Sequence, residues 1–377
     1  MKRRQFVALT ALTALTSSGL AQAQKLQAVT VSEDSPLLLN FNENSLGMSP
    51  KALQAATDSL AGAFRYPDAA RATLIEAIGR YFGVAKECVT LGNGSSEVIQ
   101  ATIHALAHKA LSEGKTVQLV VPDPTFNYAE IYAEAIGVSV VKVPLKAEDL
   151  SIDVVAMQKV VSAFEGISIC YICNPNNPTA TITPKQMLDD WIEAKSPMTY
   201  FILDEAYADY VTDKDFKSGI EYVQAGNTQV VVTRTFSKLH AMAGLRVGFG
   251  VAEPSTVALV EGFVSIDNTN APAAVAAMTS LQDESFIKLS LETTALSRKI
   301  VCDALDQLNL KYLPSQANFI FHEIKGDHAQ YKQRMAEAHV MVGREFMPGF
   351  NRLTLGTPDE MQAFVKVLFD FRKKGWV

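Results

Sequence analysis

The sequence predicts an α/β fold, with a mostly parallel sheet of about seven strands in a large domain and a smaller α+β domain after it. Short apolar runs recur along the middle of the chain, and segments with helical periodicity separate them. Strands and helices that alternate in this way form parallel sheets covered by helices on both faces. The runs lie at residues 88–91, 117–122, 138–145, 167–173, 199–204, 229–233 and 247–251.

Size and charge narrow the class of protein. A chain of 377 residues, 48% hydrophobic and 20% charged, can bury one large core and still form a second domain. The formal net charge is −6, from 34 basic and 40 acidic residues, and no basic block follows the N-terminus. Nucleic-acid binding therefore has no electrostatic footprint in this sequence.

Residues 1–23 have the three parts of a signal peptide. A basic start, MKRRQF, precedes the short apolar stretch VALTALTALTSSGL, and Ala21-Gln22-Ala23 forms an A-x-A cleavage pattern. The adjacent Arg3 and Arg4 resemble a bacterial twin-arginine export signal. The apolar stretch is too short for a comfortable membrane span. We therefore expect a periplasmic or secreted protein without stable membrane association.

The remaining segments complete the predicted organisation. Residues 37–41 read as a short strand and residues 51–60 and 70–82 as helices, while 318–322 and 352–355 are strand-like segments among later helices. We expect residues 24–64 to form an arm with part of the small domain, residues 65–255 the large domain, and residues 256–377 the C-terminal small domain.

Cysteine and histidine give no metal site. Cys170 and Cys173 are three apart on one predicted strand, so they point to opposite faces and are expected to be buried structural thiols. His104 and His108 have a spacing that can bind a metal on a helix, but no third ligand is evident. A solvated helix face is the favoured interpretation.

Polar motifs follow the predicted strands, where ligands bind in such sheets. The glycine-rich turn 92–97 opens a helix whose N-terminus suits a phosphate. Asp204 ends one strand, and Lys238 follows another together with two hydroxyls and Arg246. A lysine amine can form a Schiff base with an aldehyde, while hydroxyls and a guanidinium take up a phosphate. Each motif alone could be ordinary loop chemistry, but together they form the inventory of a pyridoxal phosphate site.

The sequence at this point resembles the fold type I, class I/II pyridoxal-phosphate-dependent aminotransferases, and within them the histidinol-phosphate aminotransferase family. The resemblance covers essentially everything after residue 36. Its motifs, in family order, are N-E-N-S-L-G-M-S-P, R-Y-P-D, G-N-G-S-S-E, P-D-P-T-F, N-P-N-N-P-T, D-E-A-Y, T-F-S-K with A-G-L-R-V-G-F, and R-L-T-L-G-T.

The resemblance implies a role for each matching residue. Lys238 would be the Schiff-base lysine, Asp204 would pair with the pyridinium nitrogen, and Tyr207 would bond the phenolate oxygen of the ring. These three are the expected catalytic residues. The other expected cofactor contacts are Asn177 at the phenolate oxygen, Phe126 stacked on the ring, and Gly94, Ser95, Ser96, Thr235, Ser237, Arg246 and Tyr66 at the phosphate, with Tyr66 supplied by the neighbouring subunit of a homodimer.

Substrate binding is implied at four further positions. Arg352 would bind a substrate carboxylate, Arg344 would be a second, substrate-selecting arginine, and Asn44 and Leu46 would belong to the pocket. Leu46 stands where histidinol-phosphate enzymes commonly have tyrosine, and Ala180 replaces a glycine of the N-P-T-G motif. With the export signal, the leucine favours an aromatic or other amino acid over histidinol phosphate as the amino donor.

The expected reaction moves an amino group between an amino acid, or a histidinol-phosphate-like amine, and a 2-oxo acid. Two alternatives stay open at this stage. A decarboxylase, β-lyase or racemase could use the same fold and cofactor, and a non-catalytic module could bind pyridoxal phosphate without turning substrate over.

Overall fold

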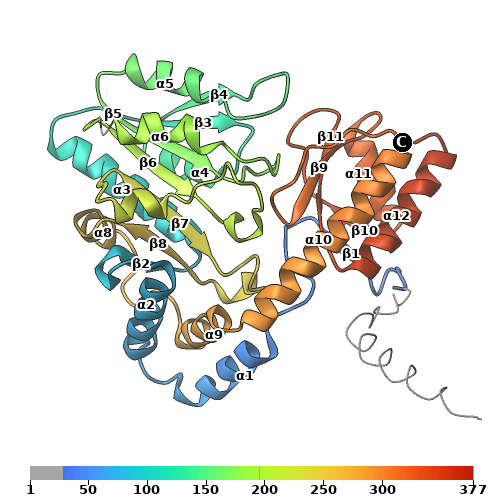
Figure 1. Cartoon of the computed structure of the whole chain (residues 1–377), viewed down its shortest axis with the longest axis horizontal. Coiled ribbons are helices and arrows are strands. Elements are labelled where there is room, and N and C mark those ends of the chain that lie inside the picture. Colours follow the sequence, from blue (N-terminus) through green and yellow to red (C-terminus); the bar gives the residue numbers. More distant parts are fainter. Residues whose placement is uncertain (1–28, 195, 377) are drawn as a thin grey trace, which may run out of the picture.

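The structure, a computed structural model, describes residues 29–194 and 196–376. The predicted signal peptide, residues 1–23, lies outside the described residues. The chain forms a larger lobe around one sheet and a smaller lobe that contains its C-terminal end (Figure 1). The long helix α10 (Glu284–Gln307) runs from one lobe to the other.

The larger lobe is built on a seven-stranded sheet in the order β2-β8-β7-β6-β5-β3-β4. Only β8 runs against the others, so the prediction of a mostly parallel sheet is confirmed. Every strand coincides with a predicted apolar run to within two residues. The strands are β2 (Val89–Gly92), β3 (Val117–Asp123), β4 (Ser139–Pro144), β5 (Ile167–Cys173), β6 (Thr199–Asp204), β7 (Val230–Thr235) and β8 (Gly248–Ala252).

Helices cover both faces of this sheet, as the alternating side chains of its strands require. On one face, α3 (Ser95–Ser112) and α4 (Tyr128–Ala135) pack on a core that includes Cys173. On the other, α5 (Val154–Ser162), α6 (Lys185–Glu193) and α7 (Ile220–Gln224) pack on a core that includes Cys170. The two cysteines are thus buried free thiols on opposite faces, as their spacing predicts.

The smaller lobe has a core of its own. Helices α10, α11 (His328–Glu337) and α12 (Pro358–Lys373) surround the antiparallel pair β9 (Phe319–Glu323) and β11 (Phe350–Thr354). The arm joins this core because β1 (Leu37–Leu39) pairs in parallel with β10 (Val340–Val342). The sequence analysis did not identify β10, a strand of three residues.

Three helices near the proposed domain boundary belong with the sheet. Helix α9 (Ala271–Leu281) packs against α1 (Pro50–Ser59) and α2 (Asp68–Phe82), and side chains of all three enter the core on one face of the sheet. The sequence analysis instead assigned residues 256–377 to the small domain. Helix α9 is apolar enough to pack in either core, so its pattern could not decide this; the domain boundaries stay a prediction.

No helix in the described part of the chain is both long and apolar enough to cross a membrane.

A buried ion pair stabilises the end of β7 beside the site. Arg234 donates to the Glu205 carboxylate at 2.6 Å and to Asp209 at 3.0 Å, and the side chains of Arg234 and Glu205 are 9% and 2% exposed. The Ser218 hydroxyl also donates to Glu205, at 2.8 Å. Loss of the arginine would leave the Glu205 charge buried without its cation.

We expect Arg234→Ala to lower the free energy of unfolding by about 3–5 kcal/mol, the usual cost of breaking a buried pair. Urea denaturation followed by circular dichroism measures this. The matched control is Lys299→Ala, which removes an exposed pair with Asp303 at 2.6 Å and should change stability by less than about 0.5 kcal/mol. Equal effects of the two substitutions would contradict the role of burial.

Candidate active site

A cavity of about 240 Å³ lies where the carboxyl ends of β5, β6 and β7 meet the arm and β11. It brings together most of the residues that the sequence analysis selected. Those lining it are Ser95, Ser96, Phe126, Asn177, Asp204, Tyr207, Thr235, Ser237, Lys238, Arg246 and Arg352. Phe41, Asn42, Tyr128, Cys173, Ala206 and Ala243 complete the wall.

Lys238 follows β7 and is only partly accessible. Its amine donates a hydrogen bond to the Phe41 carbonyl oxygen at 3.1 Å. Burial, with a smaller contribution from the positive charge of Arg352, lowers the pKa of Lys238 to about 8. A substantial fraction of the amine is therefore neutral, and hence nucleophilic, near physiological pH.

Asp204 is the last residue of β6 and is 3% exposed. The Tyr171 hydroxyl donates to its Oδ2 at 2.7 Å, and the Ala206 N–H donates to its Oδ1 at 3.2 Å. Burial raises the pKa of the Asp204 carboxyl above its ordinary value, against the effect of these hydrogen bonds. A cationic group placed in the cavity would stabilise a carboxylate in this position.

Tyr207 and Asn177 present hydrogen-bonding groups beside Asp204. Tyr207 is 4% exposed, and burial raises the pKa of its phenol, so it stays protonated. The Asn177 Oδ1 accepts from Arg352 Nη1 at 2.8 Å, which leaves the amide nitrogen of Asn177 as a donor. Ala180, in the turn after Asn177, has φ +61° and so adopts the left-handed conformation that glycine adopts most readily.

The opposite end of the cavity suits an anion. Helix α3 begins at Ser95, where free backbone N–H groups and the helix dipole favour negative charge. A Cβ atom at Gly94, whose φ is +81°, would lie 2.2 Å from Arg246 Nη2, so only glycine lets the guanidinium reach this turn. Thr235 Oγ1 donates to Ser237 Oγ at 2.9 Å on the other side. Serine and threonine hydroxyls, N–H groups and a guanidinium are phosphate ligands.

These observations fit the predicted cofactor. Pyridoxal phosphate needs an amine, an anionic partner for its ring nitrogen, a donor for its ring oxygen and a phosphate site. One cavity supplies Lys238, Asp204, Tyr207 and the α3 N-terminus with Arg246.

Two arginines, Arg352 and Arg344, lie beside the same aromatic ring. Arg352 is 7% exposed, and its Nη2 donates to the Asn40 carbonyl oxygen at 2.6 Å. Arg344 is exposed and donates to Asn127 Oδ1 at 3.1 Å. Both guanidinium carbons lie over the Phe346 ring, at 4.9 and 4.8 Å from its centroid. Two cations are thus held at one aromatic ring, and of the two arginines Arg352 lines the cavity.

Five predicted residues do not line the cavity: Gly94 and Arg344, described above, and Asn44, Leu46 and Tyr66. Asn44 Nδ2 donates to the Leu239 carbonyl oxygen at 2.9 Å and to Ser290 Oγ at 2.7 Å, so it fixes the arm. Leu46 is partly buried outside the cavity wall. Tyr66 is 80% exposed and lines a separate surface pocket. The roles of these residues stay predictions.

Sequence reasoning missed several residues of this region, among them Tyr171, Tyr128 and Asn42. Tyr171 precedes Cys173 by two residues on β5, so strand alternation could have placed it on the same face. Tyr128 follows Phe126 in a motif that was identified, and the two ring centroids are 4.3 Å apart. Asn42 opens the N-E-N-S-L-G-M-S-P motif, but the motif did not show its role, because its contacts are with residues 165 and 312 positions away.

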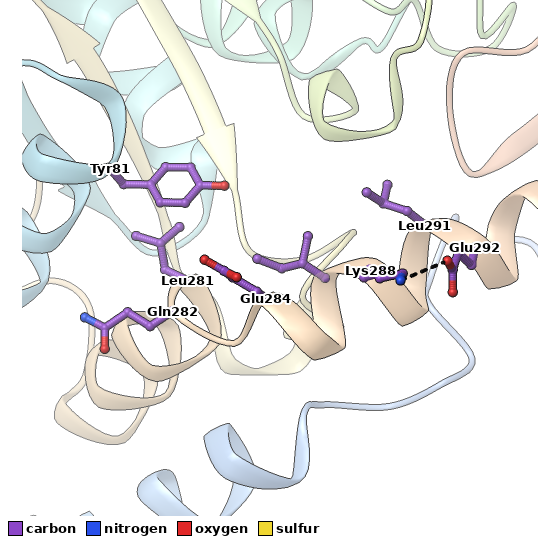
Figure 2. A pocket seen from close by; sticks show the side chains of 8 residues that line it. Tyr81, Leu281, Gln282, Glu284, Lys288, Leu291 and Glu292 are labelled. Carbon is purple, nitrogen blue, oxygen red and sulfur yellow. Dashed lines mark ion pairs between the residues drawn. The ribbon is translucent and has the colours of Figure 1, made fainter. Parts of the chain in front are cut away.

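A roomier hollow elsewhere has none of this chemistry. It measures about 670 Å³ and lies on the surface between α2 and the start of α10, with Tyr81 and Leu281 on its wall (Figure 2). Its one cation, Lys288, is 74% exposed and lies 3.8 Å from Glu292. Within residues 29–194 and 196–376, no three histidine, cysteine or acidic side chains gather to hold a metal. His104 and His108 instead pack near the Phe263 ring.

Comparison with known proteins identifies the family of the chain. The model of the family described as aminotransferase class I and II matches residues 34–368. The histidinol-phosphate aminotransferase of Moorella thermoacetica is 35% identical over 333 residues, which cover 88% of this chain and 84% of that protein.

Two solved structures are similar along nearly their whole length. A protein from Erwinia carotovora atroseptica, itself only provisionally assigned as a histidinol-phosphate aminotransferase, superposes with a TM-score of 0.89 at 40% identity, over 93% of this chain and 100% of that one. Histidinol-phosphate aminotransferase from Sinorhizobium meliloti, solved with pyridoxal 5′-phosphate, superposes with a TM-score of 0.80 at 21% identity. The match covers 95% of this chain and 99% of that one. The family model spans most of the chain, and the chain therefore belongs to the class I and II aminotransferases.

Proposed function

We propose that this aminotransferase uses pyridoxal phosphate to move an amino group between an amino acid, or a histidinol-phosphate-like amine, and a 2-oxo acid. The observation that carries the proposal is the Lys238 amine with its pKa of about 8, in one cavity with the buried carboxylate of Asp204. When bound, the cofactor supplies an aldehyde and a ring that accepts electrons from the substrate.

Different residues of the chain would bind different parts of the cofactor. Arg246, the hydroxyls of Thr235 and Ser237 and the N-terminus of α3 would take the phosphate. Phe126 would cover the ring, and Asp204 would hold a proton on the ring nitrogen, because a buried carboxylate is stabilised by the resulting positive charge. Tyr207 and Asn177 would donate to the ring oxygen.

Proton movement falls to Lys238. An acid–base group works best when its pKa lies near the working pH, because it can then both accept and return a proton. An ordinary lysine, with a pKa near 10.4, would stay protonated. Burial beside Arg352 brings the pKa of Lys238 to about 8, into the range where its amine can take a proton from substrate carbon and return it.

Substrate choice rests on Arg352, Arg344 and Leu46. The buried Arg352 would pair with a substrate carboxylate through the two-pronged geometry of its guanidinium. The exposed Arg344 would meet a second anionic or polar group at the mouth. An aromatic or other amino acid is the preferred donor, because leucine at position 46 removes the hydroxyl that a tyrosine would bring.

A panel of donors tests this choice. The visible absorbance band of the purified protein should bleach with one class of amino acid in the absence of a 2-oxo acid, and return when the acid is added. Histidinol phosphate belongs in the panel, because a relative is named histidinol-phosphate aminotransferase. Release of carbon dioxide or ammonia without a 2-oxo acid would instead favour a decarboxylase or lyase.

The assembly is proposed to be a homodimer in which Tyr66 completes the phosphate site of the neighbouring subunit. Large apolar side chains around it are exposed, among them Phe64 at 77% and Ile266 at 92%. Such a patch is typical of a surface that a partner covers. Analytical ultracentrifugation of the purified chain tests the dimer.

Export is proposed from the N-terminal 23 residues, with the folded protein in the periplasm or outside the cell. Cell fractionation together with the mass of the mature N-terminus tests it. A full-length chain that stays in the cytoplasm would contradict the proposal.

Replacing Lys238 with alanine should abolish the covalent attachment of the cofactor and lower kcat by about 10³-fold or more, because nucleophile and general base are lost together. Visible absorbance after gel filtration and steady-state kinetics measure the two effects. Turnover at the wild-type rate would contradict the mechanism.

Asp204→Asn should still bind pyridoxal phosphate but lose roughly 10²–10³-fold in kcat, the scale of one electrostatic stabiliser. The amide cannot stabilise a positive charge on the ring nitrogen. Asp190→Asn, at an exposed position on α6, is the matched control and should leave kcat unchanged. A similar kcat for both variants would remove Asp204 from this role.

Cofactor capture by the apo-protein should follow the titration of Lys238. Only the neutral amine attacks an aldehyde, so the capture rate should rise with pH, with a midpoint of about 8, and then level off. Stopped-flow absorbance measures the rate. Arg352→Gln removes a nearby cation that disfavours the protonated amine, so the midpoint should move to higher pH. A wild-type rate still rising at pH 10 would show an unperturbed lysine.

A further inference from the structure

Three consecutive residues of the arm reach three different residues of the site. This segment, residues 40–42, ends on the first residue of the N-E-N-S-L-G-M-S-P motif, and none of its members was selected from the sequence as a site residue. The Asn40 carbonyl oxygen accepts a hydrogen bond from Arg352 Nη2 at 2.6 Å, and the Phe41 carbonyl oxygen accepts one from Lys238 Nζ at 3.1 Å. Asn42 Nδ2 donates to the Tyr207 hydroxyl at 3.0 Å.

Asn42 is held firmly in this position. It is 1% exposed, and its φ of +54° lies in the left-handed region, which asparagine tolerates better than most side chains. The Thr354 hydroxyl accepts from the Asn42 N–H at 2.9 Å, and Asn318 Nδ2 donates to the Asn42 carbonyl oxygen at 3.0 Å. The backbone of Asn42 is thus bonded to the smaller lobe on both sides.

The same network orients the side chain of Asn42. The Thr354 hydroxyl has one proton, and it donates that proton to Asn42 Oδ1 at 3.1 Å. Because the oxygen of the amide faces Thr354, its nitrogen faces Tyr207. The amide therefore donates to the phenol oxygen, and cannot accept the phenol proton.

The hydrogen bond from Asn42 restricts the direction in which the Tyr207 hydroxyl can donate its proton. The phenol oxygen already accepts from Asn42, and burial raises the pKa of Tyr207, so the proton is retained. It must then be donated elsewhere, and the cavity that Tyr207 lines is the open direction. We propose that Asn42 is a positioning residue that makes Tyr207 a hydrogen-bond donor into the active-site cavity.

The proposal rests on the proposed function, in which Tyr207 donates to the ring oxygen of pyridoxal phosphate. A donor at that oxygen stabilises its negative charge and weakens its hold on a neighbouring proton of the bound cofactor. Loss of the donor should therefore raise the pH at which that proton leaves. This pH is read from the visible spectrum and does not depend on turnover.

The decisive substitution is Asn42→Asp, which keeps the shape of the side chain but replaces the donor with an acceptor. Tyr207 would then donate to the carboxylate and not to the cavity. We expect the midpoint of the spectral pH titration of the loaded protein to rise by about one unit, on the scale of a hydrogen bond to a charged group. Tyr207→Phe should raise it at least as much.

A double variant separates positioning from simple charge. If Asn42 acts through Tyr207, adding Asn42→Asp to Tyr207→Phe should not move the midpoint further. A carboxylate acting by its charge alone would move the midpoint equally in both backgrounds, and that result would overturn the proposal. So would an unchanged midpoint in the single variant.

Two further variants complete the design. Asn309→Asp is the matched control, since Asn309 is an exposed asparagine with φ +50° in the turn after α10, and its midpoint should equal that of the wild type. If Asn42→Asp does not fold, Thr354→Val tests the same network, because without the hydroxyl the Asn42 amide can turn over; the midpoint should again rise, and no change would overturn the proposal. A wild-type protein without a visible band would instead overturn the proposed function.

Discussion

The burial of two opposite charges in one small cavity is the constraint on which the rest of this structure depends. Burial raises the pKa of the Asp204 carboxyl and lowers that of the Lys238 amine, so each is displaced toward its neutral form. Neither is left without partners, since Tyr171 and the Ala206 N–H bond the carboxylate and the Phe41 carbonyl bonds the amine. The fold must therefore deliver hydrogen-bonding groups from several distant segments to one point.

Parallel strands position one set of these groups. Because neighbouring strands end at the same edge, the residues that follow β5, β6 and β7 converge although about thirty residues separate each pair along the chain. The anion site uses a different principle, the free N–H groups at the start of α3, and it is open to Arg246 only because Gly94 has no side chain. The sheet therefore fixes the position of the reacting groups, and the helix fixes the end at which negative charge is bound.

The second core positions the other set. Strand β11 carries Arg352 into the cavity, and the arm that pairs with β10 places residues 40–42 between the two lobes. Arg352 is buried and bonded to Asn177, and its positive charge adds a smaller effect to the burial that lowers the pKa of the Lys238 amine. The smaller lobe thus contributes to the electrostatics of the cavity as well as to its hydrogen bonds.

The sequence by itself determined where the strands of the large sheet lie along the chain and most of the residues that line the cavity. Short continuous apolar runs have to be buried on both faces of a sheet, and the motifs after the parallel strands then meet at one edge. The tertiary structure alone decided which lobe receives α9, where β10 pairs, and that the Asn42 amide meets the Tyr207 hydroxyl. Those outcomes depend on contacts such as Asn42 with Thr354, 312 residues apart, and on hydrogen bonds whose direction is set by the partners present. Local patterns record which face of an element is apolar, but they do not record which distant polar group will meet it.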